Sequence, residues 1–183
     1  MDRALGMIEF KTIAKGLEAS DAMVKTAEIK VVLAQTMCPG RFLILVKGKL
    51  GAVKAAIEKG KMLYDTNVRD SFILGNPHET LYDALDGKYT YEKVDAMGII
   101  ETSAVPSILF AADQTAKAAE VKLVKIALAN NLGGKGLIIF TGEIAAVEES
   151  IQVAALNCEN NGTLIDFSLI PNPDKKIWDA ICD

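Results

Sequence analysis

Hydrophobic and polar residues alternate in short runs along this chain, and the runs predict a regular succession of strands and helices. Residues 4–10 alternate and carry β-favouring side chains, which predicts a first strand. A set of residues at helical spacing follows and predicts the first helix: Leu17, Ser20, Val24 and Ala27. The chain therefore begins with a strand and then a helix.

The next segment predicts a hairpin, a second helix and a closing strand. Two β-rich runs, residues 30–37 and 42–47, flank Cys38-Pro39-Gly40 and predict a hairpin with a tight tip. A second helix is predicted by the spacing of Leu50, Val53 and Ile57, which is close to 3.6 residues. Residues 72–74 predict the last strand, and a short helix is expected after the Asn-Pro turn that follows.

The same pattern then occurs a second time. The segment Ala-Leu-Gly-Met-Ile-Glu at residues 4–9 returns as Ala-Met-Gly-Ile-Ile-Glu at residues 96–101. The helix that follows keeps its apolar spacing through four counterparts, Leu109, Ala112, Ala116 and Ala119, and Pro106 suits its first turn. Such a duplication indicates two copies of one domain.

Each copy predicts the order β-α-β-β-α-β followed by a small helix. This is the split βαβ, or ferredoxin-like, arrangement, an α+β fold in which two helices cover one face of an antiparallel sheet. We place the first domain at residues 1–88 and the second at residues 89–183. Residues 86–95 are polar and lack a period, which is typical of a linker.

Composition and domain size indicate packing against further protein surface. Half of the 183 residues are hydrophobic, yet no apolar run approaches the roughly 18 residues that span a bilayer. Domains of roughly 90 residues bury limited cores on their own, so extensive packing between copies or between chains is expected.

Charge, the N-terminal segment and the cysteines exclude other classes. The net charge of −4 argues against a nucleic-acid binder, which needs a basic face. No apolar targeting stretch precedes the first strand, so we expect a cytoplasmic location. Cys38, Cys158 and Cys182 do not form the disulfide framework of a secreted domain.

Three segments together resemble the bacterial microcompartment shell domain. They are Ala-Leu-Gly-Met-Ile-Glu, the helix with Ala-Ser-Asp-Ala-Met-Val-Lys, and Val-Lys-Gly-Lys-Leu-Gly-Ala-Val. The resemblance covers both copies and implies a tandem-domain shell protein. It further implies a homotrimer shaped as a pseudohexameric tile, packed with other shell proteins around metabolic enzymes. The apolar runs and the net charge predict no membrane or nucleic-acid partner.

The resemblance gives the hairpin tip a role. In single-domain relatives this tip is a Gly-Ser-Gly loop that lines a central pore, whereas here it is Cys38-Pro39-Gly40. A cysteine at this position of a tandem chain is similar to the iron–sulfur-binding trimeric shell proteins of propanediol-utilisation compartments. The matching loop of the second copy contains Leu132, Gly133 and Gly134, with Leu132 at the cysteine position.

One cysteine is a weak metal signal, because iron–sulfur clusters usually take four thiolates. If the tip faces a threefold axis, three Cys38 thiolates converge and can bind three irons of one [4Fe-4S] cluster per trimer. The fourth iron would then take a nonprotein ligand. A Zn²⁺ held by three thiolates and a water is an alternative, and a reduced thiol acting as a small hydrophobe is another. Cys158 and Cys182 are expected to be structural.

Two lysines are candidates for contacts at the tile edge. Lys25 and Lys117 occupy equivalent sites on the first helix of each copy and match the lysine by which family members meet neighbouring tiles. Solvated lysines on a polar helix face are the alternative. Asn76 and Asn172 stand where the family often has an arginine, so the edge differs in detail.

The sequence therefore leads to a non-enzymatic shell tile with a [4Fe-4S] cluster bound by Cys38, either for electron transfer across the shell or as a plug. Transfer would imply a redox enzyme or an electron carrier as a partner. One alternative is a tile whose central opening is a small-metabolite pore without a cluster. A second is a duplicated ferredoxin-like regulatory protein that binds an effector. His78, the only histidine, is expected to be structural or exposed.

Overall fold

The computed structural model describes residues 3–89, 95–129 and 132–182, and of Cys182 only the backbone. Residues 90–94 of the expected linker therefore lie outside the described part. The chain divides into two compact units. As far as they are described, the N-terminal unit contains residues 1–77 with Ala104–Ser107 and Ala129–Gly134, and the C-terminal unit contains the rest.

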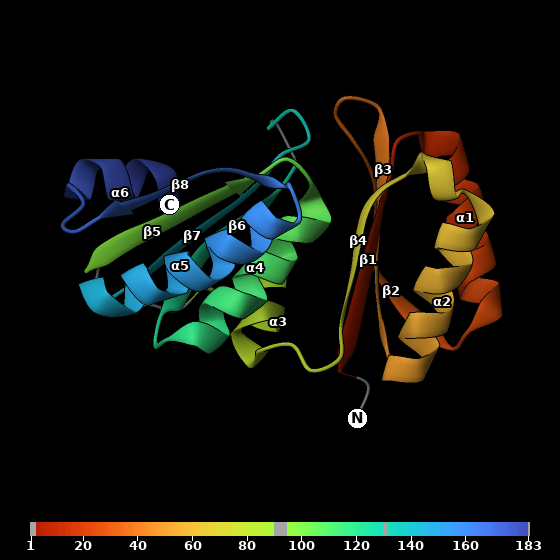
Figure 1. Cartoon of the computed structure of the whole chain (residues 1–183), viewed down its shortest axis with the longest axis horizontal. Coiled ribbons are helices and arrows are strands. Elements are labelled where there is room, and N and C mark those ends of the chain that lie inside the picture. Colours follow the sequence, from red (N-terminus) through yellow and green to blue (C-terminus); the bar gives the residue numbers. More distant parts are fainter. Residues whose placement is uncertain (1–2, 90–94, 130–131, 183) are drawn as a thin grey trace. The chain divides into compact units, whose positions relative to one another are not determined.

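The N-terminal unit is an antiparallel sheet with two helices on one face, α1 and α2 (Figure 1). The strands lie in the order β2-β3-β1-β4. Its elements are β1 (Ala4–Phe10), α1 (Ile13–Thr26), β2 (Ile29–Met37), β3 (Arg41–Gly48), α2 (Leu50–Leu63), a 3₁₀ turn (Asp65–Asn67) and β4 (Val68–Leu74). This is the predicted split βαβ order, and the last strand begins earlier than the sequence pattern indicated.

The C-terminal unit repeats this topology with the strand order β6-β7-β5-β8. Its elements are α3 (Glu79–Leu85), β5 (Ala96–Thr102), α4 (Val105–Ala118), β6 (Lys122–Leu128), β7 (Gly136–Gly142), α5 (Ile144–Asn160), β8 (Leu164–Ile170) and α6 (Lys175–Cys182). The first three residues of α4 belong to the N-terminal unit. Pro106 lies in the first turn of α4, as predicted.

β1 is a central strand, and its burial differs from what alternation suggests. All seven of its residues are buried, so both faces of the strand are covered. In the sheet register, Met7 lies opposite Leu45 on β3 and Phe72 on β4. The strand predicted over residues 4–10 is confirmed.

The residues whose spacing predicted α1 coincide only in part, at Ser20, with the face that the helix buries. Leu17 is 54% exposed and Val24 is exposed as well, whereas the helix buries Gly16, Ala19, Ser20 and Met23. Gly16 explains the difference, because a Cβ there would lie 2.5 Å from the Cβ of Phe42. Small residues thus bring α1 close to the sheet, which a search for large apolar side chains does not detect.

Both short helices that follow the Asn-Pro turns pack within the C-terminal unit. α3 contacts β6, although it follows the N-terminal sheet in the chain. α6 places Trp178 against Met97, Val124 and Ile139, on the sheet face opposite α5. Grouping by contacts therefore divides the chain after Pro77, whereas the boundary after residue 88 divides the sequence repeat.

Candidate functional site

The turn that carries Cys38 is short and closed. β2 ends at Met37 and β3 begins at Arg41, so three residues connect the strands. The Gly40 N–H donates to the Met37 carbonyl oxygen at 2.9 Å, and Gly40 adopts a φ of +82°, which favours glycine. The peptide bond before Pro39 is cis. Cys38 is exposed at this turn, so its thiol is available to a ligand outside the chain.

The matching loop of the second copy is longer and one end of it meets this turn. β6 ends at Leu128 and β7 begins at Gly136, so the connection spans residues 129–135. Gly134 belongs to the same compact unit as Cys38. A Cβ at Gly134 would lie 2.9 Å from the Cys38 carbonyl oxygen and 2.9 Å from Nη1 of Arg41. Only a glycine permits this close approach, which brings two of the predicted loop residues together.

A buried carboxylate lies behind the turn. Glu9 on β1 is 0% exposed, and its Oε1 lies 2.9 Å from Nη1 of Arg41 and 3.3 Å from Nε of Arg69. Its Oε2 accepts a hydrogen bond from the Val105 N–H at 2.9 Å. Since Arg41 is the first residue after Gly40, this network fixes the strand end next to the cysteine turn.

Burial raises the pKa of the Glu9 carboxyl above its ordinary value of 4.5. The Val105 N–H, Arg41 and Arg69 act in the opposite direction and lower it in part. Sequence reasoning missed this network. The available signal was an acidic residue within an otherwise apolar strand, in a segment that is repeated as a whole.

The equivalent pair in the second copy is open to solvent. Lys135 lies 3.3 Å from Glu101, and their side chains are 49% and 38% exposed. The position of Arg69 is occupied there by Ile165, according to the strand registers. The buried network is therefore specific to the cysteine-bearing copy, and the pair in the other copy provides a matched control.

The two lysines predicted at the tile edge have different surroundings. Lys25 forms an ion pair of 2.6 Å with Asp21, and its side chain is 74% exposed. Lys117 forms an ion pair of the same length with Asp113, which is fully buried and also accepts from the His78 backbone N–H at 2.7 Å. Lys25 is thus the more accessible of the two, and an edge role remains a prediction for both.

The remaining chemical candidates have structural surroundings. Cys158 is buried in α5, whereas the side chain of Cys182 lies outside the described residues. His78 is the N-cap of α3, and its side chain accepts a hydrogen bond from the Thr80 N–H at 3.4 Å. Within residues 3–89, 95–129 and 132–182 of a single chain, no three metal-ligating side chains of the Cys, His, Asp and Glu types lie together.

Comparison with known families identifies this architecture. The BMC domain family matches residues 4–77 and again residues 96–173, so both copies are covered almost completely. The chain therefore belongs to the BMC domain family, whose members build the shells of bacterial microcompartments. As far as the structure describes the chain, none of its helices is long and apolar enough to cross a bilayer.

Individual relatives agree with this assignment. The chain is 37% identical over 178 residues to the bacterial microcompartment shell protein PduT of Citrobacter freundii, with 97% of each chain covered. It matches the crystal structure of a microcompartment protein from Desulfitobacterium hafniense DCB with a TM-score of 0.85 and 34% identity, over 98% of this chain and 99% of the other. A fused permuted hexameric shell protein of the RMM microcompartment shares the fold at 22% identity, with a TM-score of 0.63 over 82% of this chain and 78% of the other.

These findings confirm the predicted family, the tandem fold and the location in a microcompartment shell. They also set aside the regulatory alternative, since the relatives that cover the whole chain are microcompartment proteins. The chain is a structural subunit of a shell.

Proposed function

We propose that this shell subunit has no enzymatic activity and assembles as a homotrimeric, pseudohexameric tile. In this tile, one Cys38 from each chain binds a [4Fe-4S] cluster on the central threefold axis. The observation that carries the proposal is the exposed Cys38 thiol at the tip of a three-residue turn, in a chain built from two copies of a shell domain.

Support for an assembly of several chains comes from unequal burial of the two copies. Leu17 and Val24 are exposed on α1, whereas their counterparts Leu109 and Ala116 are buried on α4. Copies of one fold tend to use the same surface for packing, and exposed apolar residues at such positions mark an interaction site. The outer face of α1 is therefore the surface that a neighbouring chain would cover.

A closed ring of three tandem chains would provide a neighbouring chain that covers the outer face of α1. The two ends of a tandem chain present different surfaces, so contacts between chains are heterologous, and such contacts form a ring when the rotation between neighbours closes. Such a ring has six similar domains and only threefold symmetry. Each feature specific to the first copy, including Cys38, then occurs three times around the axis.

The residues at the turn fit a cluster shared between chains. Fe–S clusters are held by cysteine thiolates, and a single chain offers one exposed cysteine at this turn. The short connection leaves little room for the turn to move, and the ion pair of Arg41 with the buried Glu9 holds the following strand. When bound, a [4Fe-4S] cluster can accept or donate an electron. The chain's own contribution is to hold the thiols at a fixed position.

Electron transfer across the shell, with a redox enzyme or an electron carrier as partner, is the function that such a cluster would serve. Other shell subunits are the partners at the tile edges, where Lys25 and Lys117 are the candidate contacts.

The test is metal analysis of anaerobically purified protein, with Cys38→Ser as the variant. We expect four irons and four sulfides per trimer and a broad visible absorption. The variant should lose the iron, the sulfide and the absorption while the trimer persists. A matched control is Cys158→Ser, which should retain the iron. An iron-free anaerobic trimer would contradict the cluster and leave the metabolite pore as the role of the axis. Zinc in place of iron and sulfide would also contradict it.

A further inference from the structure

The start of α4 is held by two carboxylates within the N-terminal unit, to which its first three residues belong. The Val105 N–H donates to Oε2 of Glu9 at 2.9 Å, and the Ser107 hydroxyl donates to Oδ2 of Asp70. Glu9 on β1 and Asp70 on β4 are direct cross-strand partners, and both Glu9 and Val105 are fully buried. Neighbouring carboxylates on these two strands therefore bind the first turn of a helix.

The second sheet carries the same two carboxylates in the same arrangement. Glu101 on β5 is the cross-strand partner of Asp166 on β8, as Glu9 is of Asp70. Oδ1 of each aspartate accepts a hydrogen bond from the backbone N–H of the following residue, at 2.7 Å in β4 and 2.8 Å in β8. In the second sheet, however, the Glu101 side chain is 38% exposed and Asp166 is exposed as well. The carboxylate pair that binds a helix start in one unit thus faces solvent in the other.

The start of α1 is the counterpart of the start of α4, and it is open to solvent. Both helices have 14 residues, so Ile13 matches Val105 and Lys15 matches Ser107. Val105 is fully buried, whereas Ile13 is half-buried and Lys15 is exposed. Thr12, the N-cap residue of α1, makes no capping hydrogen bond through its side chain. The helix start that is covered in the second copy is therefore uncovered in the first.

We propose that the start of α1 in one chain binds the Glu101–Asp166 pair of a second copy of the chain. The exposed helix start and the exposed carboxylates are the two halves of a contact that the N-terminal unit already makes. Because the halves differ, each chain offers one half to the copy before it and the other half to the copy after it, which makes the contact heterologous. This contact rests on the proposed homotrimer and is the one through which its chains meet.

Charge favours this contact over a second copy of the internal one. Lys15 places an ammonium group where α4 has a serine, so its pair with Asp166 is ionic. Within one chain, the Lys15 ammonium lies 3.0 Å from Glu18 and 4.6 Å from the ring centroid of Tyr64. Its side chain is 47% exposed and has three donors, so it can contact Asp166 and keep Glu18. The first turn of α1 contains no acidic residue, and Glu101 supplies the carboxylate that stabilises a helix N-terminus.

The experiment is disulfide trapping in the full chain that carries Lys15→Cys and Asp166→Cys together. Cys38→Ser is added because Cys38 is an exposed native thiol. After mild oxidation with diamide, we expect a covalent ring of three chains on a denaturing gel, and reductant should return it to single chains. A variant with only one of the two new cysteines should run as a single chain under the same conditions.

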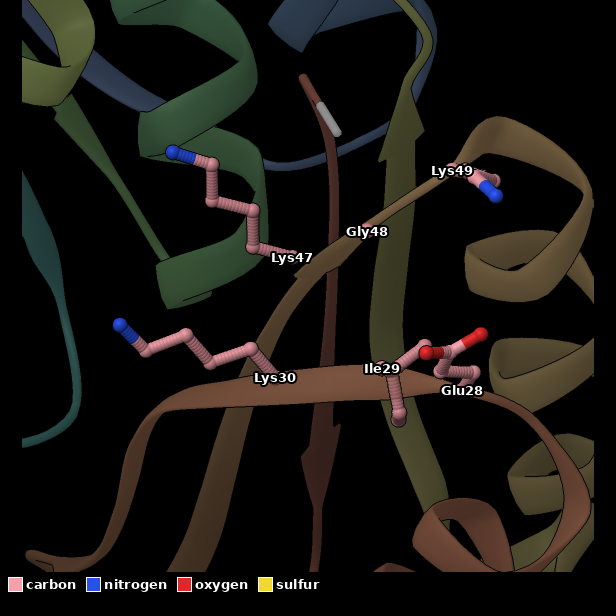
Figure 2. Close-up of a pocket in the computed structure, with 6 residues that line it drawn as sticks. All are labelled: Glu28, Ile29, Lys30, Lys47, Gly48 and Lys49. Carbon is pink, nitrogen blue, oxygen red and sulfur yellow. The ribbon is translucent and has the colours of Figure 1, made fainter. Parts of the chain in front are cut away.

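Two matched controls come from the same chain. Ser107→Cys with Asp70→Cys reproduces the contact within one chain and should form a disulfide without a change of mass. Lys30→Cys with Asp166→Cys should remain without a cross-link. Lys30 is exposed on β2 and follows the other end of α1, so roughly 15 Å or more of helix separates it from the proposed contact. Figure 2 shows its side chain beside that of Lys47.

Sedimentation velocity of the wild-type chain separates failure of this contact from failure of the tile. A wild-type trimer whose Lys15→Cys and Asp166→Cys variant forms no cross-link would overturn the contact and leave the homotrimer in place. Equal cross-linking by the Lys30→Cys control would show random collision and also overturn the contact. A wild-type monomer would overturn both. A covalent ring from a protein whose wild-type trimer contains no iron would support the contact and contradict only the cluster.

Discussion

Replacing Arg41 by methionine is expected to destabilise the N-terminal unit by about 3 kcal/mol. The change keeps most of the side-chain length and removes the charge that lies 2.9 Å from the buried Glu9 carboxylate. Breaking a buried ion pair by removing one partner costs about 3–5 kcal/mol. The lower end applies because Glu9 keeps Arg69 at 3.3 Å and the Val105 N–H at 2.9 Å.

Lys135→Met is the matched control, since it removes the corresponding pair in the second copy. The side chains of that pair are 49% and 38% exposed, so its loss should cost below about 1 kcal/mol. For a unit of this size, 1 kcal/mol shifts the midpoint by about 4–8 °C. Thermal unfolding by circular dichroism, at equal chain concentrations, should then show a shift of roughly 12 °C or more for Arg41→Met and a much smaller one for Lys135→Met. Equal shifts would refute the reasoning that burial determines the value of these pairs.

Three further predictions concern packing, titration and assembly. Gly16→Ala should lower the free energy of unfolding by about 1–3 kcal/mol in chemical denaturation, because the added Cβ would overlap Phe42 of the sheet. The control is Gly51→Ala, which has open space around it and should be neutral or stabilising. The opposite order would contradict the close packing of α1. Because burial raises the pKa of Glu9, the folded state binds its proton more tightly than the unfolded one, and this contribution to stability is lost as pH rises from 4.5 through the raised pKa. The unfolding free energy of Glu9→Gln should therefore depend less on pH than that of the wild-type chain. An unchanged slope would contradict a raised pKa for Glu9. Leu17→Asp should convert trimers to smaller species in sedimentation velocity while Met62→Asp, which lies on α2, does not; intact Leu17→Asp trimers would place the interface elsewhere.

The sequence was sufficient for the order of elements and the sheet of each copy. Period-two and period-3.6 patterns predicted the strands and helices, and the repeat supported each assignment twice. It was not sufficient for the buried face of α1, since Gly16 and Ala19 carry little hydrophobic signal yet allow the closest approach to Phe42. Local patterns report which residues are apolar, whereas burial also depends on which residues are small enough to let two elements meet.

The candidate site was predicted in part. The cysteine turn was predicted because its residues interrupt a β-rich run and because the family resemblance implies a pore-lining loop there. The network behind it was not found, because Glu9, Arg41 and Arg69 come from three strands and only the sheet register brings them together. The packing of α3 against β6 was missed for a related reason. The repeat assigns that helix to the first copy by sequence, whereas its contacts depend on the path of the chain.

The most direct test of the central claim is an anomalous-scattering map at the iron edge from crystals of the anaerobically purified protein. We expect one iron cluster on a threefold axis, with Sγ of Cys38 from each of three chains bonded to it. Crystals that place the three Cys38 turns at the outer rim of the trimer, away from the axis and without iron, would contradict it.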